Sequence, residues 1–128
     1  VCDYAGVTLD PSLYRGRSLR PVVEGRVTTL HEEVFVETLL SGVGMRGWSI
    51  VGPRYKYVLY QWGRNREALY DLQEDPGEMI NLAVDRRYAG ELNRLRRALY
   101  EWGERIGDPR LIRNMRPYAG VGERSAEN

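Results

Sequence analysis

The sequence predicts an α+β fold in which a four-stranded antiparallel sheet packs against one long C-terminal helix. Two observations carry this prediction. Four short runs rich in β-branched and aromatic residues follow one another between residues 33 and 72, separated by turns. Apolar residues then recur at alternating steps of four and three from residue 88 to residue 106, which is the spacing of one helical face. Because the connections between the strand-like runs are short, they favour an antiparallel meander.

The four predicted strands cover residues 33–40, 46–51, 54–62 and 67–72. In the third strand both faces are apolar or aromatic: Val58, Tyr60 and Trp62 point one way, and Tyr55, Tyr57 and Leu59 point the other. A sheet with one wet face should instead alternate between apolar and polar residues. We therefore expect both faces to be covered. The chain offers one long helix as a cover, so the other face would meet a missing domain or a partner chain.

The long helix is predicted over residues 86–106. Its apolar stripe comprises Tyr88, Leu92, Leu95, Leu99, Trp102 and Ile106. Asp85 is a plausible N-cap, and Gly107 followed by Pro109 predicts the end of the helix. Gly90 inside the helix is interpreted as a point of close approach to a strand.

Two features precede the helix. Residues 75–78 (Asp-Pro-Gly-Glu) fit a type II turn, in which Gly77 supplies the positive φ. Asn81 could bond the backbone locally and set the entry into the helix. Residues 108–128 are polar and show no periodicity, and we expect the last dozen to be mobile.

Composition excludes several classes of protein. The 128 residues are enough for one modest core, and the net charge of +1 provides no field for polyanions. No apolar run approaches the ~20 residues that span a bilayer, so we expect a soluble protein of the cytoplasm or periplasm. With Cys2 the single cysteine and His31 the single histidine, the chain can form neither an internal disulfide nor a metal site rich in these residues.

Few residues are candidates for chemistry. Arg46 and Trp48 could hold a sulfated sugar by charge and stacking, against the simpler interpretation of a sheet-edge aromatic beside a solvated Arg. His31 lacks a nucleophile or second ligand beside it, and we interpret it as structural. The acidic residues Asp71, Glu74, Asp75 and Glu78 could attract a cation, but they surround a turn, and turn formation explains them better. No catalytic and no metal-binding residue is assigned.

Several segments, in the same order, resemble the C-terminal subdomain of the sulfatases, within the alkaline-phosphatase superfamily. They are Cys-Asp-Tyr-Ala-Gly-Val at 2–7, Gly-Arg-Ser-Leu-Arg-Pro at 16–21 with Glu24-Gly25, Val-Phe-Val-Glu-Thr at 34–38, the run 54–83, and the helix from Tyr88 to Asp108. The run 54–83 contains Tyr-Lys-Tyr, Leu-Tyr-Asp-Leu, Asp-Pro-Gly-Glu and Asn-Leu-Ala. The resemblance covers residues 1–108. Val51-Gly52 departs from it, since many relatives carry Arg-Thr there.

The resemblance implies three parts. Residues 1–26 would be the remnant of the terminal helix of a catalytic domain plus a linker, 27–108 the C-terminal α+β subdomain, and 109–128 a tail. Sulfatases hydrolyse sulfate esters or sulfamates with a formylglycine, made from Cys or Ser in a C/S-x-P/A-x-R motif, and a divalent cation, usually calcium. Cys2 is followed by Asp3-Tyr4-Ala5, which does not match that motif. We therefore expect a sulfatase C-terminal fragment that binds no cofactor itself, is inactive alone, and meets sulfated substrate only through the parent enzyme.

Three alternatives stay open at this point. The chain could be a stand-alone interaction or oligomerisation module, because an uncovered apolar face should associate with itself or with a partner. The parent could be a related phosphodiesterase or phosphonate hydrolase, which the C-terminal region does not distinguish. A binder of anions or nucleic acid is disfavoured, because acidic residues interleave with Arg86, Arg87, Arg94, Arg96 and Arg97. We expect no nucleic-acid and no membrane partner.

Overall fold

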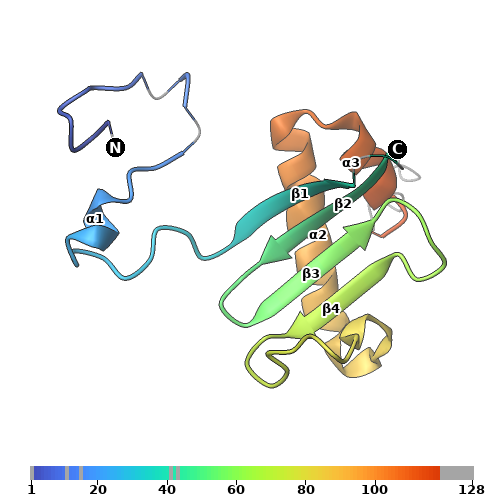
Figure 1. The fold of residues 1–128 in the computed structure, drawn as a ribbon. Helices are drawn as coiled ribbons and strands as arrows, with labels where there is room; N and C mark the ends of the chain where they lie inside the picture. Colours follow the sequence, from blue (N-terminus) through green and yellow to red (C-terminus); the bar gives the residue numbers. More distant parts are fainter. Residues whose placement is uncertain (1, 11, 15, 41, 43, 119–128) are drawn as a thin grey trace, which may run out of the picture. The chain divides into compact units, whose positions relative to one another are not determined.

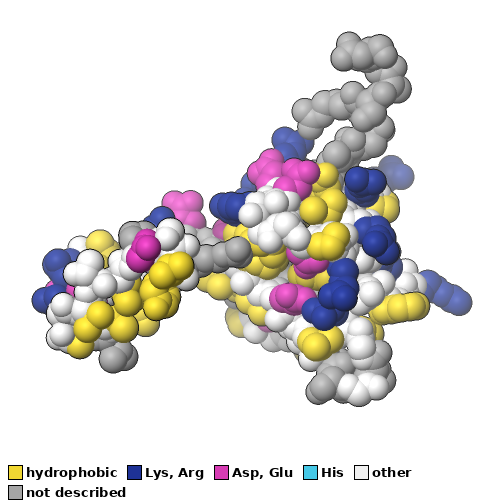
Figure 2. Space-filling model, turned by 90° about the horizontal axis from the view of Figure 1, so that it is seen from above, with side chains coloured by type: hydrophobic (Ala, Val, Ile, Leu, Met, Phe, Trp, Pro, Cys, Tyr) yellow, Lys and Arg dark blue, Asp and Glu magenta, His cyan; other side chains and the backbone are white. Residues whose placement is uncertain are grey.

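The computed structural model describes residues 2–10, 12–14, 16–40, 42 and 44–118, and the chain divides into two compact units, 1–32 and 33–128. In the first unit a single turn over residues 2–6 ends at Gly6, whose φ of 69° is left-handed. Helix α1 (Arg20–Val23) follows, with Pro21 in its first turn. Several apolar side chains of this unit are exposed, among them Leu13 and Val23, and hydrophobic surface shows on it in Figure 2.

The second unit contains the predicted antiparallel meander. Its strands are β1 (Val34–Leu40), β2 (Met45–Val51), β3 (Tyr55–Tyr60) and β4 (Glu67–Asp71), and they lie in the order β1-β2-β3-β4. All three neighbouring pairs are antiparallel. Every predicted strand is thus present, with ends within two residues of the expected ones.

Helices α2 (Ala89–Ile106) and α3 (Pro109–Met115) cover one face of this sheet. Figure 1 shows α2 crossing behind the four strands. The residues buried between sheet and helices form one core: Trp48, Ile50, Tyr57, Leu59 and Leu69 from the strands, Leu92, Leu95, Leu99 and Tyr100 from α2, and Leu111 and Met115 from α3. The aromatic ring of Phe35 stacks on Trp102 at 5.1 Å between centroids. We call this side of the sheet the helix face.

The ends of the long helix agree with the sequence prediction in part. Gly107 ends α2 with φ 69°, as expected. Asp85 does accept a hydrogen bond from a backbone N–H, that of Arg87, but it caps the short 3₁₀ turn Arg86–Tyr88 that leads into α2. A second such turn, Leu82–Val84, is capped by Asn81, whose side chain accepts from the Ala83 N–H. The entry into the helix is therefore a pair of capped turns.

The expectation that residues 108–128 lack periodicity is wrong for their first part. Pro109 begins α3, and Asp108 caps it by accepting from the N–H groups of Arg110 and Leu111 at 2.9 and 3.2 Å. Leu111 and Met115, one helical turn apart, are both fully buried. Tyr118 packs against the core as well. Of the dozen residues expected to be mobile, 119–128 lie outside the described residues.

Two glycine predictions are corrected by the structure. A Cβ at Gly90 would meet nothing within 4 Å, so this residue is no point of close approach. The close approach in α2 is at Gly103, and it is to helix α3: a Cβ on Gly103 would lie 3.0 Å from the side chain of Leu111. In the turn at 75–78, Gly77 is not left-handed; Glu78 is, with φ 54°. The turn is therefore not type II, and an amino acid with a side chain takes the left-handed position.

Both acidic and basic side chains lie on the face of the second unit that Figure 2 shows. The net charge of the chain is +1. Among the residues that the structure describes, no helix has the length and apolar character needed to cross a membrane.

Candidate functional site

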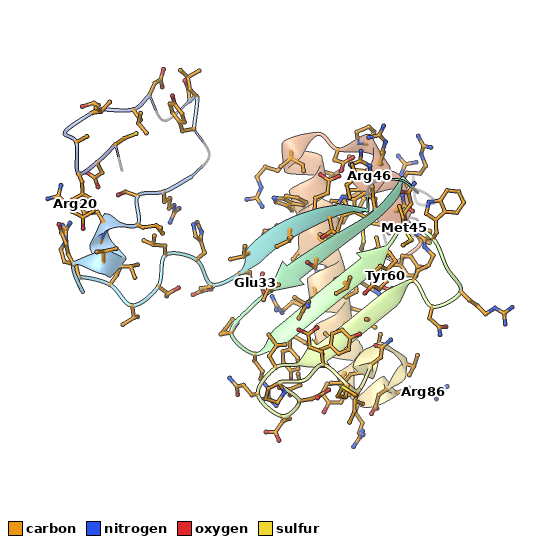
Figure 3. The ribbon with its side chains drawn as sticks, in the orientation of Figure 1. Arg20, Glu33, Met45, Arg46, Tyr60 and Arg86 are labelled. Carbon is orange, nitrogen blue, oxygen red and sulfur yellow. The ribbon has the colours of Figure 1, made fainter. Side chains whose placement is uncertain are left out.

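Arg46 and Trp48 are the second and fourth residues of β2, and both side chains lie on the helix face because they alternate with Gly47. Trp48 is fully buried, and its Nε1 has no hydrogen-bond partner within the described part of the chain. Arg46 pairs with Glu37 of β1. It lies with Met45 and Tyr60 at one end of the sheet (Figure 3). In this structure the indole presents no free ring face, while the guanidinium stays partly accessible.

The acidic residues 71–78 serve the local fold. Asp71, 2% exposed, accepts two bonds from Arg54, at 3.0 and 2.8 Å, and caps the following turn by accepting from Gln73 N and Glu74 N. The hydrogen bonds from Arg54 hold the pKa of Asp71 below its ordinary value. Asp75 accepts from the Ile80 N–H at 2.8 Å, which closes the next turn.

Glu78 pairs with Lys56, whose Nζ lies 2.7 and 3.0 Å from its two carboxylate oxygens. This ion pair joins the left-handed turn residue to β3, 22 positions away. Together with the roles of Asp71 and Asp75, it leaves three of the four acidic residues engaged in holding turns and strands. The exposed Glu74 contributes its backbone N–H, which donates to Asp71. The structural interpretation of this run is the one that the contacts support.

A polar network that the sequence did not reveal ties β3, β4 and α2 together. Tyr57 donates to Glu67 at 2.6 Å, and Arg96 forms a bidentate pair with the same carboxylate at 2.8 and 2.6 Å. Burial raises the pKa of the Tyr57 phenol, and the bonds to Glu67 raise that of Arg96. Arg96 also lies over the Tyr118 ring at 5.4 Å. These contacts lock the helix to the sheet and leave no group free for proton transfer.

Asn81 performs a similar task at the edge of the sheet. Its side-chain oxygen accepts from the Leu69 and Ala83 N–H groups, and its amide donates to the Glu67 carbonyl at 3.0 Å. Because β4 is an edge strand, these bonds satisfy backbone groups that no fifth strand would pair. The local bond expected of Asn81 is confirmed, with an additional contact to the sheet.

The face of the sheet opposite the helices has no covering element within residues 33–118. Its central row is Val36, Ser49, Val58 and Ala68, which are paired across the four strands. A groove of about 490 Å³ runs over β1, β2 and β3. Its lining on this side is both apolar and polar: Val36, Thr38, Met45, Gly47, Ser49, Val51, Lys56, Val58 and Tyr60. We call this side the open face; Figure 1 looks onto it. Val51, where the resemblance leads us to expect Arg, is one of the residues that line the groove.

The described residues do not match the metal ligands and the formylglycine motif that the resemblance to sulfatases implies. No group of three or more His, Cys, Asp or Glu that could hold a metal ion occurs among the described residues. Cys2 lies in a segment without the motif from which formylglycine is made. The side chain of His31 is exposed, and its backbone carbonyl accepts a hydrogen bond from the Thr29 hydroxyl at 2.9 Å.

Comparisons with known proteins place this arrangement in a family. Residues 1–105 match the family model "N-sulphoglucosamine sulphohydrolase, C-terminal". A curated relative from Bacteroides thetaiotaomicron, Delta 4,5-hexuronate-2-O-sulfatase, is 37% identical over 111 residues. Among solved structures, a 2-O GAG sulfatase is 36% identical with a TM-score of 0.73.

Another solved protein, whose structure holds its substrate D-glucosamine-2-N,6-O-disulfate, is 23% identical to this chain with a TM-score of 0.73. At this identity the match supports the fold and nothing more. The chain spans 23% of the length of the curated relative, while 84% of this chain is covered by the match. The matched region is thus a C-terminal portion of a much longer kind of protein. The chain belongs to the sulfatase family, as a homologue of its C-terminal domain.

Proposed function

We propose that this chain acts as the accessory C-terminal subdomain of a sulfuric ester hydrolase, and that it supports a catalytic domain without contributing reacting groups. The observation that carries this proposal is the family match over residues 1–105, combined with the structural engagement of the acidic residues at the turn and in the network. The sulfate ester, the formylglycine and the divalent cation would all belong to the catalytic domain.

The substrate class follows from the relatives. Two of the proteins matched at above 30% identity are Delta 4,5-hexuronate-2-O-sulfatase and a 2-O GAG sulfatase, and from their names we infer a sulfate ester carried by a sugar acid. The role proposed for Arg46 is to face this sugar from the sheet end, since its guanidinium is partly accessible. Trp48 would act through packing, by fixing the strand that carries Arg46.

A domain exchange tests the proposal. The segment of the Bacteroides enzyme that matches this chain is replaced by residues 1–118, which include the buried α3. We expect the chimera to hydrolyse the relative's 2-O-sulfated unsaturated hexuronate, whereas the enzyme without its segment is inactive. The isolated chain, incubated with an aryl sulfate and calcium, should show no turnover. A folded but inactive chimera, or turnover by the isolated chain that survives repurification, contradicts the proposal.

A further inference from the structure

We propose that the surface formed by α3 and the β3–β4 loop binds a polyanionic sugar chain. The choice of ligand rests on the proposed function, which infers a sulfated sugar acid as substrate. One juxtaposition carries the inference: arginines without an ion pair among the described residues lie beside an exposed tryptophan. We call this surface the arginine patch, and it consists of Arg64, Arg66, Arg110 and Arg113 with Trp62.

Helix α3 supplies a local excess of positive charge. Residues 109–118 contain three arginines and no acidic residue, although the net charge of the whole chain is +1. Because Leu111 takes the buried side of α3, Arg110 and Arg113, one turn apart, lie on its exposed side. Neither forms an ion pair within the described part of the chain. Arg116 lies beside α2 instead.

The β3–β4 loop, residues 61–66, supplies the other half of the patch. Trp62 is 65% exposed, and Arg64 is exposed as well. Two hydrogen bonds close the base of the loop: the Tyr60 N–H donates to the Arg66 carbonyl at 2.7 Å, and Arg66 Nε donates to the Tyr60 carbonyl at 3.0 Å. The indole and the Arg64 side chain therefore extend from a loop whose base is fixed.

Arg66 joins this loop to α3. Its Nη2 donates to the Asn114 side-chain oxygen at 2.6 Å, and its guanidinium lies 5.7 Å from the centre of the Tyr118 ring. Asn114 in turn donates to the Arg110 carbonyl at 2.8 Å. Figure 1 shows α3 and the β3–β4 loop at the same end of the sheet. The arginines of the loop and of the helix thus belong to one surface.

The acidic groups near the patch already have partners. Glu67, whose side chain is 11% exposed, holds Arg96 by two hydrogen bonds. The Asp108 carboxylate accepts from backbone N–H groups at the start of α3. On α2, by contrast, Arg94 is paired with Glu91. The interleaved charges of α2 neutralise one another, whereas those of the patch stay available for an anion.

A sulfated polyuronate matches the chemistry of this surface. Guanidinium groups form paired hydrogen bonds with sulfate and carboxylate oxygens. The Trp62 indole offers an apolar ring face on which a sugar ring can stack. Because the arginines are spread over a loop and a turn of helix, several linked anions should bind more strongly than one free sulfate. Nucleic acid is the competing polyanion, but the proposed function gives a reason only for a sulfated sugar.

Calorimetric titration of the full chain with a heparin hexasaccharide tests the patch. We expect Arg110→Gln/Arg113→Gln to weaken binding at least about tenfold, because two charge-assisted contacts are lost. The affinity of the wild type should fall at least about tenfold between about 50 and 200 mM salt. Both substitutions lie at exposed positions, so the circular dichroism should stay that of the wild type.

The matched control is Arg86→Gln/Arg105→Gln. It removes the same charge from two exposed arginines that also lack an ion pair among the described residues. Arg86 precedes the N-terminus of α2, one helix length away from α3. Arg105 follows Gly103 by two residues, so it points to the side of α2 away from Leu111. We expect this variant to bind within about twofold of the wild type.

Trp62 gives a spectroscopic readout of the same binding. Trp48 is fully buried and Trp102 is partly buried against the core, so iodide should quench mainly the fluorescence of Trp62. We expect the heparin hexasaccharide to protect Trp62 from iodide. Trp62→Phe should remove this protection and keep most of the affinity, whereas Trp62→Ala should weaken binding further, since it leaves no ring for stacking.

Two further ligands distinguish the kinds of polyanion. Desulfated heparin of the same length and single-stranded DNA of equal charge should each bind at least about tenfold more weakly than the heparin hexasaccharide. DNA that binds as tightly means that the patch recognises nucleic acid, and it overturns the inference. Equal losses in the two double variants, or a full chain that does not bind heparin, also overturn it. None of these measurements uses the chimera, so they leave the proposed function standing, while an inactive chimera overturns the proposed function and not the binding.

Discussion

The two faces of the sheet are built from the same four strands, yet they differ in what covers them. On the helix face, Trp48, Ile50, Tyr57 and Leu59 are fully buried under α2 and α3. On the open face, Val34, Val36 and Tyr60 are 51%, 40% and 39% exposed, while Val58 and Ala68 are 8% and 3% exposed. Since both faces carry apolar residues, hydrophobicity alone does not decide which face the helices cover. The difference teaches that the large buried side chains of this unit are concentrated on one face, while the other has no covering element within residues 33–118.

The largest effect is expected when one apolar side chain on each face is truncated and the losses of stability are compared. Trp48→Ala should destabilise the isolated chain by about 3–5 kcal/mol, because it opens a cavity in the core. Val36→Ala, the control on the open face, should cost less than about 1 kcal/mol. Urea unfolding followed by circular dichroism measures both. Similar losses for the two variants would show that the open face is already part of a core.

The buried carboxylate at the end of β4 gives the second test. Hydrogen bonds from Arg54 lower the pKa of Asp71 from its ordinary value of 3.8. A carboxylate with a lowered folded-state pKa stabilises the fold above its unfolded-state pKa, and this contribution is lost as pH falls. Asp71→Asn should therefore be less stable than the wild type at pH 7, and the difference should shrink below about pH 4.

Unfolding midpoints in urea between pH 3 and pH 7 measure this difference. Glu101→Gln, at an exposed position of α2, is the control and should run parallel to the wild type. A gap between Asp71→Asn and the wild type that keeps its size down to pH 3 would mean that the charge of Asp71 contributes nothing.

The contact between α2 and α3 gives the third test. Gly103→Ala should cost about 1–3 kcal/mol, because the added methyl group would overlap Leu111. Gly90→Ala, in the same helix but facing open space, should instead stabilise by up to about 1 kcal/mol. In thermal unfolding, the melting temperature should fall for Gly103→Ala and rise for Gly90→Ala. If Gly103→Ala is also stabilising, α3 does not hold the position that closes the helix face.

Elements with local signals were predictable from the sequence, and elements fixed by distant partners were not. The strands and α2 follow from repeated spacing, and Gly107 from its place after the stripe. Helix α3 has only two fully buried residues, Leu111 and Met115, too few to form a period. Close approach at Gly103 depends on where α3 lies, so the sequence indicated Gly90 instead.

The candidate site shows the same limit. Strand alternation placed Trp48 and Ile50 on one face, but nothing local to β2 specifies which face a helix will cover. The two apolar faces of β3 predict a cover on both sides of the sheet; within residues 33–118, α2 and α3 cover one of them. The groove over Val36 and Val58 is formed by three strands together, and the left-handed Glu78 forms its ion pair with Lys56, 22 residues earlier. Neither could be derived from a local pattern.

The smallest effect is expected where the open face meets the turn at 75–78. Glu78 adopts φ 54°, which costs a residue with a side chain about 1–2 kcal/mol relative to glycine. Its partly exposed ion pair with Lys56 stabilises the fold by about 0–1 kcal/mol.

Glu78→Gly removes both the backbone strain and the ion pair, so the free energy of unfolding should rise slightly or stay within about 1 kcal/mol of the wild type. Lys56→Met, which removes the ion pair and keeps the backbone strain, should be the less stable of the two variants in urea. The reverse order would show that the turn is held by the carboxylate of Glu78, so that the open face, like the helix face, depends on a polar contact for its shape.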